Sequence, residues 1–284
     1  MIEDGTTPYE RAMVSHLRTR VGRSQFLMAA GAGIVAAAYP RAAGAQTTTP
    51  ESVQDILNIA VTAEHLAVTL LTAAVQNATQ LNLTGLLLAV TQAALVEEQL
   101  HADFLEANGA KTLTDSFTVP DPKILTDQKT FLHTLADTAE PLFIAAYMAA
   151  VREFTDMKQP MLAKFAYQIG GTEAEHRAIV RAGLVVTGDM SGDPPNNKAF
   201  ETNALTTVGD ATKALMSLGF IGGTGQAATY PGRTAALAAA GSLVGAVTQT
   251  TPNSTVPAGV TTAAYPVLKQ PRHHHRRRSH HRHP

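Results

Sequence analysis

Two Glu-x-x-His motifs are the residues of this sequence best suited to bind a metal ion. One motif is Glu98–His101 and the other is Glu173–His176. A spacing of three residues places both side chains on the same face of a helix, one turn apart. Carboxylate and imidazole groups are ligands for divalent transition metals. One such motif is weak evidence, but two in one chain predict a metal site built between helices.

Two further glutamates lie in stretches typical of a helix interior. Glu64 has apolar or small neighbours apart from His65, and an ionised carboxylate buried there would need a partner. Glu140 lies in a similar stretch, between Leu135 and Tyr147. With the two motifs they complete a set of four Glu and two His, which is the ligand set of carboxylate-bridged di-iron or di-manganese bundles. The alternative interpretation leaves Glu64 on the surface and buries His65.

Pro141, directly after Glu140, is the main irregularity in this pattern. A proline inside a helix removes a backbone hydrogen bond and kinks the helix. We therefore expect the third helix to break here, which either directs Glu140 toward the metals or moves it away. In the second case Asp137, one turn earlier, is the substitute ligand.

The other titratable side chains near the motifs are expected to have different roles. The neighbouring acids are predicted to lie on solvated helix faces: Glu97, Asp103, Glu106 and Glu175. His133 is predicted to lie on the surface rather than to bind a metal. Tyr147 and Tyr167 are interpreted as packing residues beside the ligand helices, with a redox role as the alternative.

Four long helices are predicted to position these residues. Apolar residues recur with helical periodicity between turn signals, and the predicted helices span 51–78, 84–108, 126–156 and 159–186. A polar connection with Pro120 and Pro122 joins the second helix to the third. Without convincing strands between them, these helices indicate an all-α four-helix bundle. After Gly188 we expect a short amphipathic helix within 204–219 and either a packing segment or a loosely ordered extension at 235–247.

The motifs resemble those of the ferritin-like domain proteins of bacteria and plants, a family that includes plant desiccation-related proteins. Glu98-Gln-Leu-His101-Ala-Asp-Phe-Leu resembles the second-helix motif, Glu140 with Ala145-Ala-Tyr147 resembles the third helix, and Gly170-Gly-Thr-Glu-Ala-Glu-His176 resembles the fourth. The resemblance covers roughly residues 50–186. It implies a ferritin-like bundle with six candidate metal ligands: Glu64, Glu98, His101, Glu140, Glu173 and His176.

Such a centre is expected to hold two iron or manganese ions. Glu98 and Glu173 are the candidate bridging residues, and one glutamate and one histidine complete each metal position. The superfamily includes iron stores, oxidases and members without known activity. The resemblance therefore implies metal-dependent oxidation, peroxide handling or iron binding, with O2 or peroxide as partner and no catalytic residue identified. The alternative is a non-enzymatic envelope or desiccation-stress protein that uses the bundle as a scaffold.

Composition and charge exclude several classes of protein. The 284 residues include no Cys, which excludes disulfide scaffolds, thiolate zinc sites, iron–sulfur clusters and cysteine nucleophiles. Residues 46–268 carry 20 acidic and 11 basic side chains. This acidic body lacks the basic surface of a nucleic-acid-binding domain, so no specific nucleic-acid partner is expected. It suits a protein that handles cations.

The two ends of the chain differ from its middle. Residues 1–45 are predicted to be an export signal that resembles twin-arginine signals, although Ser24 stands where the second Arg belongs. General secretion is the alternative route, and an uncleaved membrane anchor is the alternative structure. Cleavage after Ala45 would make the protein periplasmic or extracellular. The bundle is assigned to 46–190 and a C-terminal extension to 191–268. The His- and Arg-rich tail at 269–284 is expected to be disordered and to bind anionic envelope polymers or metal ions.

Overall fold

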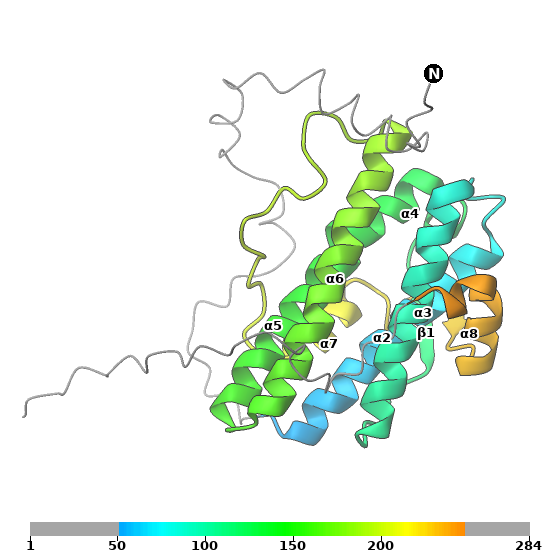
Figure 1. Ribbon diagram of the computed structural model, residues 1–284. Helices are drawn as coiled ribbons and strands as arrows, with labels where there is room; N and C mark the ends of the chain where they lie inside the picture. Colours follow the sequence, from blue (N-terminus) through cyan, green and yellow to red (C-terminus); the bar gives the residue numbers. More distant parts are fainter. Residues whose placement is uncertain (1–50, 248–284) are drawn as a thin grey trace, which may run out of the picture. The chain divides into compact units, whose positions relative to one another are not determined.

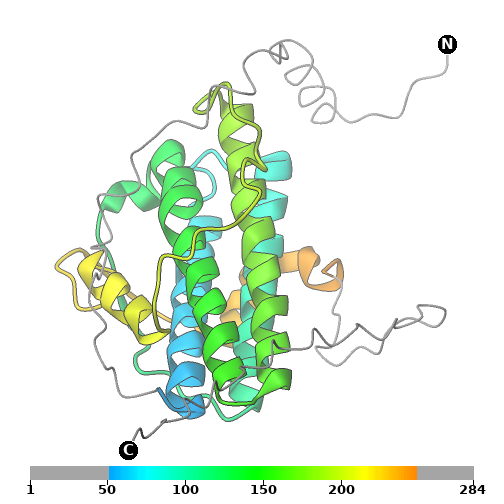
Figure 2. The ribbon, with the colours of Figure 1, turned by 90° about the vertical axis from the view of Figure 1, so that its left-hand side faces the viewer.

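The computed structural model describes residues 51–247, which form a helical bundle with short additional elements. Four long helices lie side by side in this bundle (Figures 1 and 2). They are α2 (Val53–Gln76), α3 (Gly85–Ala107), α5 (Glu140–Asp156) and α6 (Pro160–Thr187). Helix α2 packs mainly against α3, and α5 packs mainly against α6. The predicted all-α bundle is confirmed. The export segment 1–45 and the tail 269–284 lie outside the described residues.

Helix α2 begins at a capping box and is buried on nearly all sides. The Ser52 side chain accepts a hydrogen bond from the backbone N–H of Asp55, and the Asp55 carboxylate accepts one from the N–H of Ser52. Among the described helices, α2 is long and apolar enough to cross a membrane, and 78% of its apolar window is buried inside the protein. A helix that is apolar all round is typical of the core of a bundle.

The third helical stretch is divided close to Pro141, as the sequence predicts. Helix α4 (Gln128–Thr134) is followed by a single π-helical turn, η2 (Leu135–Ala139), and then by α5, of which Pro141 is the second residue. Proline is tolerated in the first turn of a helix because its missing N–H would have no partner there. The π turn connects α4 to α5, so the helical stretch continues after a local break.

The residues after α6 return to the bundle and cover two of its sides. Helix α7 (Gly209–Ser217) contacts α2 and α5, whereas α8 (Arg233–Ala240) contacts α2 and α3. The 3-10 turn η3 (Gly241–Gly245) also contacts α3. In Figure 2 the yellow α7 and the orange α8 lie on opposite sides of the long helices. The short helix predicted within 204–219 is confirmed, and 235–247 forms a packing segment.

Two carboxylates hold the start of α7 against the bundle. Glu51 accepts a hydrogen bond of 2.9 Å from the N–H of Gly209, and Glu153 accepts one of 2.9 Å from the N–H of Val208. The N-terminus of a helix carries a partial positive charge, so negative side chains are favourable there. The extension is therefore attached by specific contacts to the residue Glu51 before α2 and to Glu153 of α5.

A two-stranded antiparallel sheet is the element that the sequence analysis missed. Strand β1 (Ser116–Val119) lies in the polar connection after α3, before the 3-10 turn η1 (Pro122–Leu125), and pairs with β2 (Gln226–Thr229) of the extension. In this register Phe117 is opposite Ala228. Each strand has only four residues, which is too short for a periodic pattern to be recognised. The two strands are also far apart in the sequence.

Candidate metal centre

The bundle brings six carboxylate and imidazole side chains from its four long helices to one place in the interior. Their donor atoms form two groups, and within each group they lie within 4.8 Å of one another. The His101 group contains Glu64, Glu98, His101 and Glu173, and the His176 group contains Glu98, Glu140, Glu173 and His176. These are the six residues predicted from the sequence, and the structure brings all of them together.

Glu98 and Glu173 belong to both groups, and each points one oxygen at each group. For Glu98, Oε2 lies 3.3 Å from Nδ1 of His101, while Oε1 lies 3.1 Å from Nδ1 of His176. For Glu173, Oε1 lies 3.4 Å from Nδ1 of His101, while Oε2 lies 3.6 Å from Nδ1 of His176. Two carboxylates in this arrangement can bridge two cations. The Nδ1 atom of each histidine faces inward.

The remaining two glutamates complete one group each. Oε2 of Glu64 lies 3.6 Å from Nδ1 of His101. Glu140 is buried in the His176 group. The π turn η2 ends directly before Glu140, so the helix break directs this side chain into the bundle rather than away from it. Asp137 is exposed and its Oδ2 lies 2.7 Å from Nδ1 of His133. It is therefore not a substitute ligand.

Several of these buried polar atoms have no hydrogen-bond partner. They are Oε2 of Glu140, both carboxylate oxygens of Glu173 and Nδ1 of His176. Among residues 51–247, no Lys or Arg forms an ion pair with any of the four glutamates of the cluster. Buried carboxylates without partners are costly, and bound cations remove that cost. The donor set therefore fits two divalent metal ions.

Comparison with known proteins agrees with this geometry. A family model described as the ferritin-like domain matches residues 52–185. The chain carries a ferritin-like domain. No curated protein and no solved structure matches the chain. The matched residues begin at the cap of α2 and end within α6, so the ferritin-like domain includes all six residues of the cluster.

Burial keeps two glutamates of the ferritin-like domain from ionising readily. It raises the pKa of Glu64 to about 8, with the charge of Glu98 adding to the effect. It also raises the pKa of Glu140 well above its usual value, although the charge of His176 opposes the rise. Both residues therefore favour the neutral form when no cation is bound.

The two shared glutamates behave in the opposite way. Burial opposes their ionisation, but the close approach of the His101 and His176 rings outweighs it and lowers the pKa values of Glu98 and Glu173. These contacts, together with Glu64 beside His101 and Glu97 beside His176, raise the pKa values of both histidines well above the usual range, again against the effect of burial. Without metal, the centre consists of imidazolium–carboxylate pairs and neutral glutamic acids.

Glu97 contacts the centre, so its assignment to a solvated face was wrong. Its Oε2 lies 2.7 Å from Nε2 of His176, and its side chain is 34% exposed. This hydrogen bond lowers the pKa of Glu97. A carboxylate that accepts a hydrogen bond from the Nε2–H group keeps the proton on Nε2. The Nδ1 atom of the neutral imidazole is then free to bind a cation. Only the packing of α3 on α6 brings the two side chains together.

Tyr147 contacts the opposite side of the centre. Its buried hydroxyl donates a hydrogen bond to Oε1 of Glu64. Burial, reinforced by the nearby carboxylates, raises the pKa of Tyr147 well above its usual value, so the hydroxyl stays protonated and remains a donor. The predicted packing role is correct but incomplete, since Tyr147 also orients a candidate ligand. Tyr167 is 74% exposed, so its interpretation as a packing residue was wrong.

His65 is buried beside Glu64 but belongs to a separate cluster. Its Nδ1 lies 2.8 Å from Asp115, its Nε2 lies 3.2 Å from Glu106, and its ring stacks on Tyr230 with centroids 3.7 Å apart. Glu64 and His65 are each only 2% exposed. The alternative with Glu64 on the surface is therefore wrong. Two successive residues can both be buried because α2 is covered on several sides.

The other acids lie at the surface or form contacts outside the centre. Glu106 and Glu175 are exposed, as predicted. Asp103 is partly buried, and its Oδ2 lies 2.8 Å from Nε of Arg233, so it holds α8 against α3 rather than facing only solvent. His133 is half-buried beside Asp137 and lies outside both groups.

Proposed function

We propose that the ferritin-like domain binds two divalent metal ions, iron or manganese, through the six clustered residues. Glu98 and Glu173 would be shared by both metal positions, and one further glutamate and one histidine would complete each position. The observation that carries this proposal is that each shared glutamate points one oxygen at each group. Carboxylate-rich sites with two histidines and no thiolate favour iron or manganese over copper(I) or a structural zinc.

We further propose that the centre takes part in metal-dependent oxidation, peroxide handling or iron binding. When bound, a pair of redox-active ions supplies electrons to O2 or peroxide. The residues of the chain hold the ions and control their surroundings. Glu97 holds the Nε2 proton of His176, and Tyr147 donates to Glu64. Such outer contacts fix the orientation of the ligands.

Metal analysis of the full chain tests the metal proposal. After dialysis to remove weakly held ions, purified protein without an affinity tag should contain about two iron or manganese ions per chain. The double variant Glu98→Ala, His101→Ala should lose at least one of them while its helix content by circular dichroism is nearly unchanged. The matched control is His133→Ala, Asp137→Ala, which removes one imidazole and one carboxylate from outside the cluster. It should keep both ions.

Two outcomes contradict the proposal. Full metal occupancy in the Glu98→Ala, His101→Ala variant refutes the ligand assignment. A wild-type chain that folds stably and contains no metal favours the alternative, in which the bundle is a scaffold in a non-enzymatic envelope or stress-protection protein.

We also propose that the protein is exported to the periplasm or beyond. The support is the sequence of residues 1–45, with its basic front, its apolar run and its small-residue site before Gln46. Mass spectrometry of the native protein should find a mature chain that starts at Gln46. A soluble cytoplasmic form that keeps residues 1–45 refutes export.

A further inference from the structure

A cavity of about 240 Å³ adjoins the His176 group. Glu97, Glu140 and His176 are among the residues that line it. Most of the other lining side chains are apolar and come from α3, α4, η2 and α6, among them Ala94, Leu132 and Ile179. Glu175 also lines the cavity and is exposed, so the cavity reaches the surface at that point.

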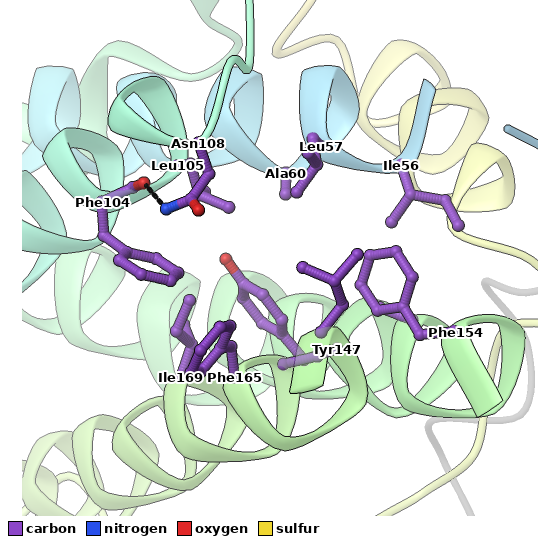
Figure 3. Close-up of a pocket in the computed structure, with 13 residues that line it drawn as sticks. Ile56, Leu57, Ala60, Phe104, Leu105, Asn108, Tyr147, Phe154, Phe165 and Ile169 are labelled. Atoms are coloured by element: carbon purple, nitrogen blue, oxygen red, sulfur yellow. Dashed lines mark hydrogen bonds between the residues drawn. The ribbon is translucent and has the colours of Figure 1, made fainter. Parts of the chain in front are cut away.

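The space described beside the His101 group is much smaller. A cavity of about 20 Å³ lies next to Tyr147, with room for about one water molecule. Figure 3 shows the Tyr147 side chain crossing this gap, with its hydroxyl pointing away from α5. Phe104, Phe165 and Ile169 fill the same gap. The surroundings of the two metal positions therefore differ, because the His176 position borders the cavity of about 240 Å³ and the gap beside Tyr147 holds about one water molecule.

We propose that the larger cavity is a binding site for a small, uncharged, mostly apolar organic molecule that carries a hydroxyl group. The part of this inference that treats the molecule as the substrate of the metal centre rests on the proposed function. The part that concerns binding in the cavity does not. An apolar protein cavity of about 150 Å³ holds one benzene ring, so 240 Å³ accommodates an aromatic ring with substituents.

The charges around the cavity decide which polar group the ligand carries. Its charged lining residues are Glu97, Glu140 and Glu175 together with His176, and no Lys or Arg from residues 51–247 lines it. The carboxylate of Glu97 has a second oxygen besides the one that accepts from His176. Carboxylates accept hydrogen bonds and repel anions, so a hydroxyl group is favoured over a carboxylate as the polar group of the ligand.

Binding of three aromatic probes of similar size tests the proposal. Phenol, toluene and benzoate are titrated into the full-length protein as purified, and binding is followed by ligand-observed NMR and calorimetry. We expect phenol to bind more tightly than toluene, and benzoate to bind at least about tenfold more weakly than phenol. Metal content is measured on the same samples, so that failure of the metal proposal and failure of this inference are separate results.

A cavity-filling variant locates the bound probe. Ala94→Phe fills the cavity one turn before Glu98 and should weaken phenol binding at least about tenfold without loss of metal. The matched control is Ala89→Phe on the same helix, where the alanine is also half-buried but does not line the cavity. It should leave phenol binding unchanged. If Ala94→Phe unfolds the protein, Ile179→Phe fills the same cavity from α6.

Each outcome of these binding experiments supports or overturns the proposed binding site. Phenol binding to a metal-free chain that is lost in Ala94→Phe supports the binding site and overturns its role beside a metal centre. No phenol binding to metal-loaded wild type, binding that survives both cavity-filling variants, or benzoate binding as tight as phenol overturns the inference.

Discussion

Binding of two divalent ions to the ferritin-like domain should release about four protons at pH 6.5. The experiment is a titration of the metal-free protein with Mn²⁺, which O2 does not oxidise readily at this pH. The expected number follows from the protonation of the six clustered residues. A metal ligand must give up its proton before it binds, so each group that is protonated in the metal-free state contributes one proton.

Four of the six residues have raised pKa values in the metal-free protein, which favours their protonated forms at this pH. They are Glu64, Glu140, His101 and His176, whose pKa values are all raised. Glu98 and Glu173 have lowered pKa values and are already ionised. In the metal-free cluster two imidazolium charges cancel two carboxylate charges. In the loaded cluster four carboxylates cancel two divalent ions, so the exchange of protons for metal keeps the interior neutral.

Calorimetry in buffers with different ionisation enthalpies measures the released protons directly. The overall association constant for two ions should also increase by about four orders of magnitude per pH unit near pH 6, because about four protons leave. The matched control is Glu97→Gln. Glu97 has a lowered pKa and is not a proposed ligand, but it helps to raise the pKa of His176, so this variant should release about three to four protons, with an affinity about 10 to 100-fold lower. Release of one proton or none by the wild type would refute the protonation states described above.

Four further predictions follow from single contacts. A Cβ at Gly170 would lie 3.0 Å from the Cβ of Tyr147, so Gly170→Ala should lower the free energy of unfolding by about 1–3 kcal/mol, whereas Gly171→Ala, with nothing within 4 Å, should raise it by about 1 kcal/mol in urea unfolding. Tyr230→Phe should cost about 1 kcal/mol because buried Gln99 loses the hydroxyl donor, and Tyr230→Ala should cost more because stacking on His65 is lost as well; equal costs would contradict this. The pKa of Glu64 is about 8 in the folded protein and near 4.5 in the unfolded chain, so its contribution to the stability of the metal-free protein should decrease from pH 4.5 to pH 8, by on the order of a few kcal/mol, and Glu64→Gln should show a smaller decrease. Deletion of residues 270–284 should remove weak nickel, copper or zinc binding at pH 7.5 and spare the tight centre; loss of the tight ions on deletion would show that the tail takes part in the centre.

The two Glu-x-x-His motifs were predictable because they depend on local geometry. Three residues along a helix bring a glutamate and a histidine to one face, whatever the rest of the chain does. The apolar surroundings of Glu64 likewise predict burial, and a buried carboxylate predicts a partner. These local signals were sufficient to select the six residues that the structure brings together.

The contacts around the six residues were not predictable in this way. Glu97 is adjacent to Glu98 on α3, and neighbouring residues on a helix point about 100° apart, which suggested a solvated face for one of them. Packing of α3 on α6 places His176 against Glu97 instead. Tyr230 and β2 reach the bundle from far along the chain, and no periodic pattern in a four-residue strand predicts its partner.

By itself, the sequence determined the helical bundle, the helix on which each candidate ligand lies and the break at Pro141, because periodicity, caps and proline act within a few residues. Tertiary structure decided three other features. It directed Glu140 inward through the π turn, set the oxygens of Glu98 and Glu173 toward both groups, and left a cavity of about 240 Å³ beside the His176 group. These depend on how side chains from different helices pack in three dimensions, which spacing along one helix does not specify.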